Sequence, residues 1–177
     1  MTPSSCALMA DYNRWMNTKL YEAAAQLSDE QLRQDRGAFF GSLYETLNHL
    51  AVADTIWLQR FAQHPALGDL KTAMQDFPKP TSLRQPLANS FAELRDYRTR
   101  LDAVILQFAQ QLTPAQLAEA LRYANTAGQP HARNFGAVLL HFFNHQTHHR
   151  GQASTLLFQA GVDIGVTDLF TLIPNEV

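Results

Sequence analysis

Apolar residues recur every three to four positions along four long stretches of the chain, the spacing that places them on one face of an α-helix. The predicted helices cover residues 5–27, 42–63, 82–112 and 134–161. Residues suited to capping helix ends stand at the expected places, namely Ser4 or Ser5, Ser42, Asn134 and, after the last helix, Gly161. Pro86 falls in the first turn of the third helix, where a proline is tolerated.

The segments between these helices contain turn-forming residues. Residues 28–31 form a capping-box pattern that predicts one extra helical turn, and residues 65–80 have the glycine and prolines of a surface connection. A short helix is predicted over residues 115–123, before a turn-rich loop at 125–130, and no regular structure is predicted for 162–177. No alternation of period two is long enough for a sheet, so the pattern predicts an all-α fold. Four long helices with two long connections are typical of a four-helix bundle other than a simple up-down-up-down one.

The second predicted helix is apolar on two sides. One face consists of Leu43, Leu47, Leu50, Trp57 and Phe61, the other of His49, Val52, Ala53 and Ile56, with Tyr44, Asn48, Thr55 and Gln59 left as a polar edge. A helix with two apolar faces packs on two sides. Since one four-helix core covers only one side of most of its helices, the remaining face predicts a homodimer.

Length and charge narrow the class of protein. The 177 residues fit a single domain, and a content of 46% hydrophobic and 17% charged residues excludes a disordered chain. The formal net charge is -2, so the chain has no basic excess for binding nucleic acid or an anionic membrane. The single cysteine, Cys6, cannot form an internal disulfide, and the sequence predicts no secretory signal or membrane span. We therefore expect a cytoplasmic protein.

Histidines are concentrated in the fourth predicted helix. His145 and His149 are one turn apart on a line that has Val138 and Leu156 at its ends, so this line faces the core. Two stacked core imidazoles must each find a partner and stay uncharged, and a divalent cation satisfies both. Histidines at i and i+4 are also the spacing of HExxH zinc sites. Here Gln146 stands where those sites have their glutamate, so a zinc protease is disfavoured.

Two histidines hold a metal ion weakly, so a third ligand is expected from another helix. His49 is the candidate because it lies on the second apolar face of the second helix, whereas His64 and His131 fall in predicted loops. A pair formed by His141 and His145 remains an alternative.

Three residues near His145 and His149 have predicted roles other than binding the metal ion. Gln152 lies on the same line and is a candidate to support a ligand from behind. His148 lies about 60° off the line and is interpreted as structural. Arg150 points about 140° away from His145, which favours a salt bridge or a packing contact over a catalytic role.

Two segments of the chain resemble the DinB family of the DinB/YfiT-like metalloenzyme superfamily. They are Gly41-Ser42-Leu43 through Leu47-Asn48-His49-Leu50, followed by Asp54, Trp57 and Arg60, and Asn144-His145-Gln146-Thr147-His148-His149-Arg150-Gly151-Gln152. The likeness extends over nearly the whole chain, including residues 163–169. It implies a four-helix bundle of up-up-down-down order, usually dimeric, with a divalent metal ion held by His49, His145 and His149. We expect that ion to be zinc or nickel.

The resemblance also sets the expected chemistry. Relatives in the superfamily include thiol-dependent S-transferases and a mycothiol-dependent maleylpyruvate isomerase, and the family name refers to induction by DNA damage. A three-histidine site with open positions lowers the pKa of a bound water or thiol. We expect a metal-dependent enzyme, S-transferase-like or hydrolytic, that acts on a small molecule, with a low-molecular-weight thiol as candidate cofactor. The alternative is a non-catalytic metal-binding stress-response dimer, in which Asp54 or His141 closes the site as a fourth ligand.

Overall fold

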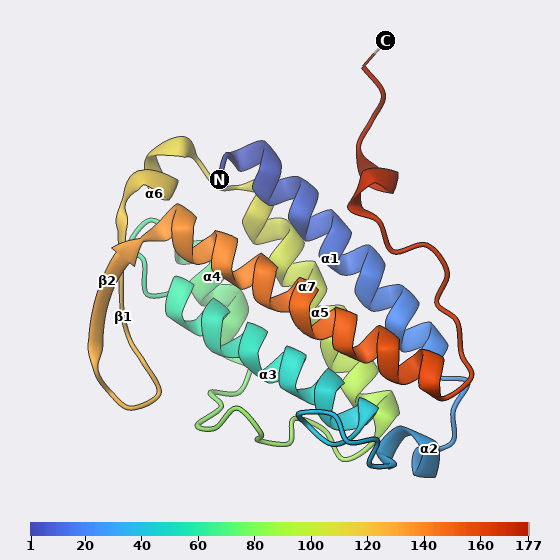
Figure 1. Ribbon diagram of the computed structural model, residues 1–177. Coiled ribbons are helices and arrows are strands. Elements are labelled where there is room, and N and C mark those ends of the chain that lie inside the picture. Colours follow the sequence, from blue (N-terminus) through green and yellow to red (C-terminus); the bar gives the residue numbers. More distant parts are fainter. Residues whose placement is uncertain (177) are drawn as a thin grey trace.

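The computed structural model describes residues 1–176, and most of them are helical (Figure 1). The four long helices are α1 (Pro3–Ala24), α3 (Leu43–Phe61), α5 (Phe91–Gln110) and α7 (Phe135–Gln159). The short elements are α2 (Asp29–Arg33), α4 (Gly68–Ala73), α6 (Pro114–Ala118), the turns η1 (Met74–Asp76) and η2 (Leu169–Leu172), and the strands β1 (Ala120–Ala124) and β2 (Pro130–Asn134). The prediction of a mostly helical chain is confirmed, but the small antiparallel sheet of β1 and β2 was not predicted.

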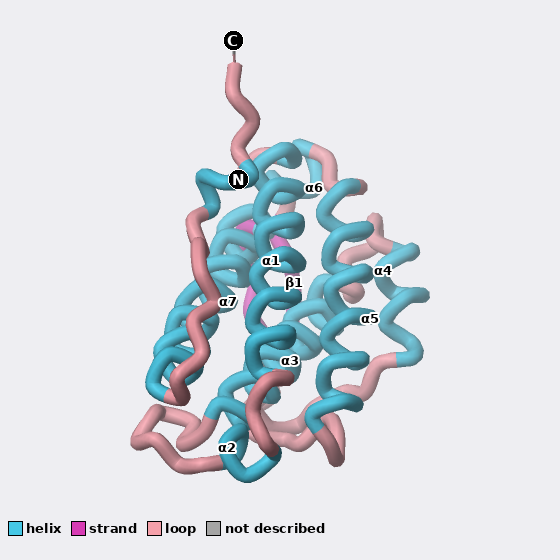
Figure 2. The backbone as a smooth tube through the Cα atoms, turned by 90° about the vertical axis from the view of Figure 1, so that its right-hand side faces the viewer, coloured by secondary structure: helices cyan, strands magenta, loops and turns pink. Residues whose placement is uncertain are grey.

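The four long helices lie side by side around one apolar core (Figures 1 and 2). Between α1 and α5, Asn13 donates a hydrogen bond to Asp102 while Tyr21 stacks on Phe91, so these two helices are antiparallel. The contacts between α3 and α5 are Thr55 with Tyr97 and Phe61 with Phe108, and those between α3 and α7 are His49 with His149 and Phe61 with Phe135. Helix α3 is therefore parallel to α5 and antiparallel to α7.

The long helices thus run up-down-down-up, and the up-up-down-down order expected from the resemblance is wrong. Helix α1 ends and α3 begins at the same end of the molecule, where α2 packs on α3 (Figure 1). The long segment 62–90 then returns the chain to that end before α5 begins, and α6 with the hairpin connects α5 to α7 at the opposite end. An apolar period determines which residues share a helix face, but it carries no information on the direction of successive helices.

Most ends of the long helices follow their capping residues. Ser42 and Asn134 cap α3 and α7 as predicted, each accepting a hydrogen bond from the backbone N–H three residues later. Gly161 follows α7 with a φ of +84°, the left-handed conformation that glycine adopts without strain. Helix α1 starts earlier than predicted because Thr2 is its N-cap and Pro3 is its first residue.

The predicted helix over residues 82–112 is wrong in its first turns. Helix α5 begins only at Phe91, and residues 82–89 form a non-helical segment against α3. The buried side chain of Asn48 donates to one backbone carbonyl of this segment and accepts from one of its N–H groups. These hydrogen bonds satisfy a buried amide and hold the segment out of the helix.

The hairpin occupies residues where a short helix was predicted up to residue 123. Helix α6 ends at Ala118, and the loop between β1 and β2 contains Gly128 with a φ of +79°. Leu121 is fully buried while its neighbour Arg122 is exposed, so one face of the hairpin packs on the protein. Strands of five residues are too short to stand out as a period in a turn-rich sequence.

Both apolar faces of α3 are covered within the chain. Helix α3 packs against α4, α5 and α7, and the segment 82–89 lies on the edge that was predicted to be polar. Asn48 and Thr55 on that edge are buried, and the hydroxyl of Tyr44 donates to the carbonyl of Ala88. The two apolar faces of α3 therefore give no reason to expect a partner chain, and the homodimer stays a prediction that rests on the resemblance.

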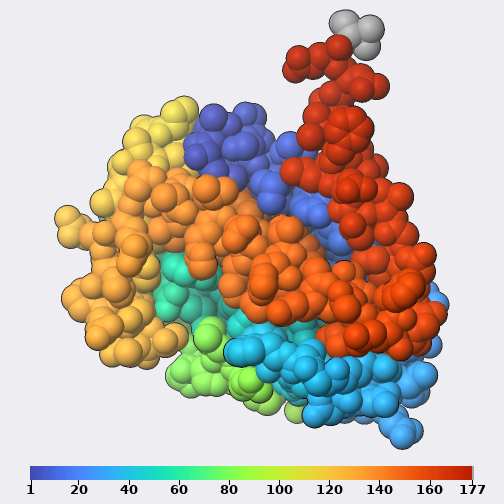
Figure 3. Space-filling model, in the orientation of Figure 1, coloured from blue at the N-terminus to red at the C-terminus, as the bar shows by residue number. Residues whose placement is uncertain are grey.

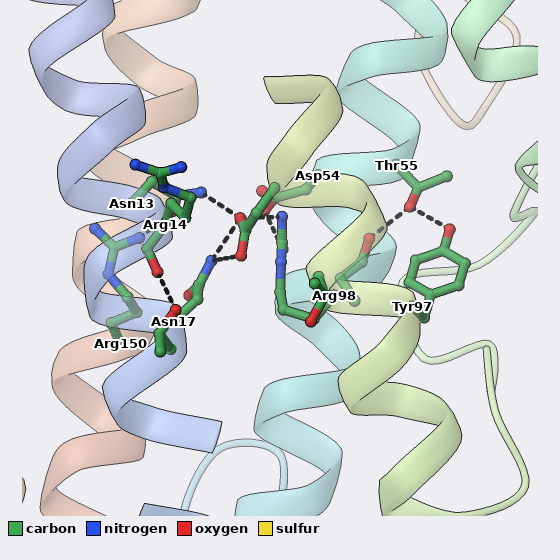
Figure 4. Close-up of polar contacts among 12 residues, drawn as sticks. Asn13, Arg14, Asn17, Asp54, Thr55, Tyr97, Arg98 and Arg150 are labelled. Carbon is green, nitrogen blue, oxygen red and sulfur yellow. Dashed lines mark hydrogen bonds and ion pairs between the residues drawn. The ribbon is translucent and has the colours of Figure 1, made fainter. Parts of the chain in front are cut away.

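A network of buried polar side chains joins the long helices (Figure 4). Arg98 on α5 forms ion pairs with Asp54 on α3 at 2.6 Å and with Asp102 at 2.9 Å. Asn13 on α1 donates to Asp102 and accepts from Arg150 on α7. Arg150 therefore forms a hydrogen bond in the core, where a salt bridge or a packing contact was predicted. Removing a member of such a network leaves a buried charge or polar group without its partner.

The C-terminal segment runs back along α1 and α7 before it projects from the body (Figures 1 and 3). Lys19 and Tyr12 on α1 hold it by donating to the backbone carbonyls of Val166 and Thr167. Within residues 1–176, no helix has an apolar stretch long enough to cross a bilayer.

Candidate metal centre

Three histidines from two antiparallel helices meet in one cluster. His49 lies on α3, and His145 and His149 lie one turn apart on α7. Their candidate ligand atoms all lie within 4.8 Å of one another. The imidazole centroids of His49 and His149 are 4.6 Å apart, and those of His145 and His149 are 4.4 Å apart. The structure thus brings together the three histidines that the sequence singled out.

Hydrogen bonds define which nitrogen of two of these rings is free. Nδ1 of His49 lies 3.0 Å from the carbonyl oxygen of Leu83, and Nδ1 of His149 lies 2.7 Å from Oε1 of Gln152. Because both oxygens only accept, each Nδ1 carries the proton and donates. The Nε2 atoms of both neutral rings therefore keep a free lone pair, as a metal ligand requires.

Burial keeps the cluster uncharged. His49 is 3% exposed and His149 is 9% exposed, and the ring of Phe40 stacks on His49 at 4.0 Å. Desolvation lowers the pKa of both imidazoles below the ordinary value. The pKa of His145 falls to about 3, chiefly through desolvation and then through the neighbouring His149 and His49. All three rings are therefore neutral at pH 7, the state that binds a metal ion without first releasing a proton.

The donor set fits a metal ion. Nε2 of His49 and Nδ1 of His145 are buried and have no hydrogen-bond partner within residues 1–176. Buried polar atoms without a partner are rare in folded proteins and destabilise them. Three neutral imidazoles are a common donor set for zinc and also suit nickel. The cluster could therefore hold a metal ion.

Comparison with known proteins identifies the family of the chain. The sequence model of the DinB family matches residues 1–175. The chain belongs to the DinB family. It is 27% identical to Protein DinB of Bacillus subtilis (strain 168) over 158 residues, which is 89% of this chain and 87% of that protein. No solved structure matches the chain.

The other two histidines of α7, His141 and His148, lie outside the cluster. His141 is exposed and packs edge-on against Trp57, with ring centroids 5.4 Å apart. The alternative pair of His141 and His145 therefore does not form a three-histidine cluster in the structure. His148 is exposed, and Gln152 lies 3.4 Å from its Nε2 while it also binds His149. Gln152 supports a cluster member from behind, in the position that the sequence suggested.

Asp54 also stays out of the cluster, although it belongs to the DinB-like segment of α3. Its carboxylate is bound by Arg98 at 2.6 Å in the core. Among residues 1–176, the cluster contains no fourth histidine, cysteine or carboxylate. Neither Asp54 nor His141 therefore closes the cluster as a fourth ligand in this DinB-family chain.

The two weaker candidates from predicted loops have other partners. His64 is buried, lies 3.1 Å from a carboxylate oxygen of Glu119 and stacks on Phe135. His131 lies on β2 and stacks on Tyr123. Neither belongs to the three-histidine cluster.

Two contacts of the DinB-family cluster escaped sequence reasoning. Phe40 covers His49, and the carbonyl of Leu83 fixes its tautomer. The carbonyl leaves no trace in the sequence, because any residue supplies one and only the fold brings it to His49. Phe40 directly precedes the DinB-like segment that begins at Gly41, and this adjacency was the one signal available.

Proposed function

We propose that the protein binds one divalent cation through His49, His145 and His149 and uses it in a metal-dependent reaction on a small molecule. The reaction is thiol S-transferase-like or hydrolytic, and zinc and nickel are the ions that suit the ligands. The observation that carries the proposal is a cluster of three neutral imidazoles that lacks a fourth ligand among the described residues. Such a ligand set leaves room for an exogenous molecule.

The expected chemistry follows from the positive charge next to the open coordination position. A divalent cation held by the three histidines would supply Lewis-acid activation of a water or a thiol at neutral pH. The protein's own contribution is to orient His49 and His149 through their Nδ1–H groups and to shield one side with Phe40. Fixed tautomers and restricted water access strengthen a metal site beyond its direct ligands.

A reacting thiol must come from outside the chain. Cys6 is the only cysteine of the sequence, and it is fully buried on α1. Burial raises the pKa of its thiol, so it is a poor nucleophile. This supports a low-molecular-weight thiol as cofactor wherever the reaction is a thiol transfer.

The remaining features of the proposal rest on the family and the composition. We propose a homodimer, as the DinB resemblance implies, and the single cysteine supports a cytoplasmic location. A stress-related role belongs to the non-catalytic alternative. A formal net charge of -2 supports a small molecule over nucleic acid as the ligand.

Removal of the metal tests the proposal. We expect the chelated protein to keep its far-UV circular dichroism, because a helical core of this size does not depend on a metal staple. Thiol-transfer or hydrolytic activity found in a substrate screen should disappear with the metal and return when it is restored. His148→Ala serves as the control, since His148 is exposed and lies outside the cluster. Unfolding on chelation, with no activity in any metal-loaded form, would favour the non-catalytic alternative.

A further inference from the structure

A cavity of about 590 Å³ lies between the hairpin and the first turns of α7. Trp57 of α3, Tyr123 and Arg133 of the hairpin and His141 of α7 are among its lining residues. This volume lies within the range of small-molecule sites. Figure 3 views the molecule from this side, where α3 is visible between the hairpin and α7.

A row of aromatic rings connects this cavity to the three-histidine cluster. His141 lies 5.4 Å from Trp57 and 6.1 Å from His145, a member of the cluster, measured between ring centroids. Trp57 follows His49 by two turns of α3, which is about 12 Å of helix. His141 thus lines the cavity and neighbours the cluster member His145, so the cavity lies beside the cluster.

The charges at the cavity are positive and lack a counter-ion. Arg133 lines it, and the guanidinium of Arg60 lies 4.6 Å from the ring of Trp57 and 5.2 Å from that of Tyr123. Neither arginine forms an ion pair within residues 1–176. The cavity lining and the first turn of α7 contain no acidic side chain. Burial lowers the pKa of Arg60, whereas Arg133 is exposed, and an anion bound in the cavity would lie near two guanidinium groups with no competing carboxylate.

The register of the hairpin places Arg133 on the cavity side. Arg133 pairs with Leu121, and directly opposite residues of an antiparallel pair share a face. Leu121 is fully buried, and Tyr123, two residues later, lies on the same face. Arg122 pairs with Ala132 on the other face, and both arginines are exposed. The two arginines thus differ in face while they share the same hairpin.

We propose that this cavity binds the carboxylate of a substrate whose body is a flat aromatic or unsaturated group. The guanidinium of Arg133 matches a carboxylate with two parallel hydrogen bonds. The rings of Trp57 and Tyr123 pack against the flat body. Delivery of the far end of this molecule to the cluster rests on the proposed function, whereas binding in the cavity does not.

The test is a titration of the metal-free protein with 1-naphthoate, followed by the indole N–H signals of the two tryptophans in NMR. Trp57 lines the cavity, while Trp15 packs against Tyr12 on α1 and serves as an internal reference. We expect the Trp57 signal to shift and the Trp15 signal to stay. Neutral 1-naphthamide should bind about tenfold more weakly, because it cannot form the charge-assisted pair. Acetate, which lacks the flat body, should produce no saturable shift.

Two matched variants locate the carboxylate. Arg133→Gln should weaken 1-naphthoate binding about tenfold and leave 1-naphthamide binding unchanged. Arg122→Gln removes the same charge from the opposite face and should change neither. Equal binding of the two probes, equal effects of the two variants, or an unshifted Trp57 signal would each overturn the inference. Zinc binding measured on the same samples separates the two proposals, because 1-naphthoate binding without zinc binding refutes only the proposed function.

Discussion

Replacing Arg98 by methionine should strongly destabilise the protein, because Arg98 is the cation between two buried carboxylates. Its guanidinium lies 2.6 Å from Asp54 and 2.9 Å from Asp102. The exposed fractions are 2% for Arg98, 1% for Asp54 and 5% for Asp102. Arg98→Met keeps a similar volume but leaves both carboxylates in the core without their cation.

The magnitude follows from that burial. Breaking a buried ion pair by removing one partner costs about 3–5 kcal/mol. In a domain of this length, each kcal/mol lowers Tm by roughly 2–4 °C, so a decrease of about 6–20 °C is expected. Arg95→Met is the matched control, since Arg95 is exposed on the same helix and should change the free energy of unfolding by less than about 0.5 kcal/mol.

The pH dependence tests the cause of the loss. Burial raises the pKa of Asp54 and of Asp102, and Arg98 acts in the opposite direction on both. Without Arg98 the two pKa values rise further, and the carboxyls take up protons more readily as the pH falls. The destabilisation measured by urea unfolding should therefore be larger at pH 8 than at pH 5. A loss below about 1 kcal/mol at pH 8, or an equal loss at both values, would refute the reasoning.

Three further predictions concern the cluster and the helices α3 and α7 that carry it. The metal-free protein should gain stability from pH 5 to 6.5, because His145 has a pKa of about 3 when folded and an ordinary one when unfolded. His145→Leu should lessen this slope by up to about 1.4 kcal/mol per pH unit in urea unfolding, and an unchanged slope contradicts it. Gln152→Leu should weaken zinc binding about 10–100-fold in a competition titration. An unchanged zinc affinity would show that the hydrogen bond to His149 does not support the site. Ser42→Ala should lower the free energy of unfolding by about 1 kcal/mol in thermal unfolding. No change would show that the Ser42 cap does not stabilise α3.

The long helices could be predicted where their signals are local. Ser42 and Asn134 cap helices whose apolar period lies in the same stretch of sequence, and both helices form as expected. The start of α5 could not be predicted in this way, because the side chain of Asn48, far away in the sequence, binds the backbone of residues 82–89. The directions of the helices likewise depend on contacts between distant residues.

The site shows the same division between local and distant information. His145 and His149 share a helix line, and His49 lies on an apolar face of α3, so periodicity identifies all three. The carbonyl of Leu83 and the cavity beside Tyr123 depend on a loop and a hairpin that no period indicates. Sequence reasoning therefore found the candidate ligands and missed the groups that orient them and that line the neighbouring cavity.

Metal content per chain, measured on the wild type and on single alanine variants, tests the central claim most directly. We predict one divalent ion per wild-type chain, its loss in His49→Ala, His145→Ala and His149→Ala, and its retention in His141→Ala and His148→Ala. Circular dichroism of each variant establishes that the comparison is made on folded protein. Unchanged stoichiometry in His49→Ala together with loss of the ion in His141→Ala would contradict the account.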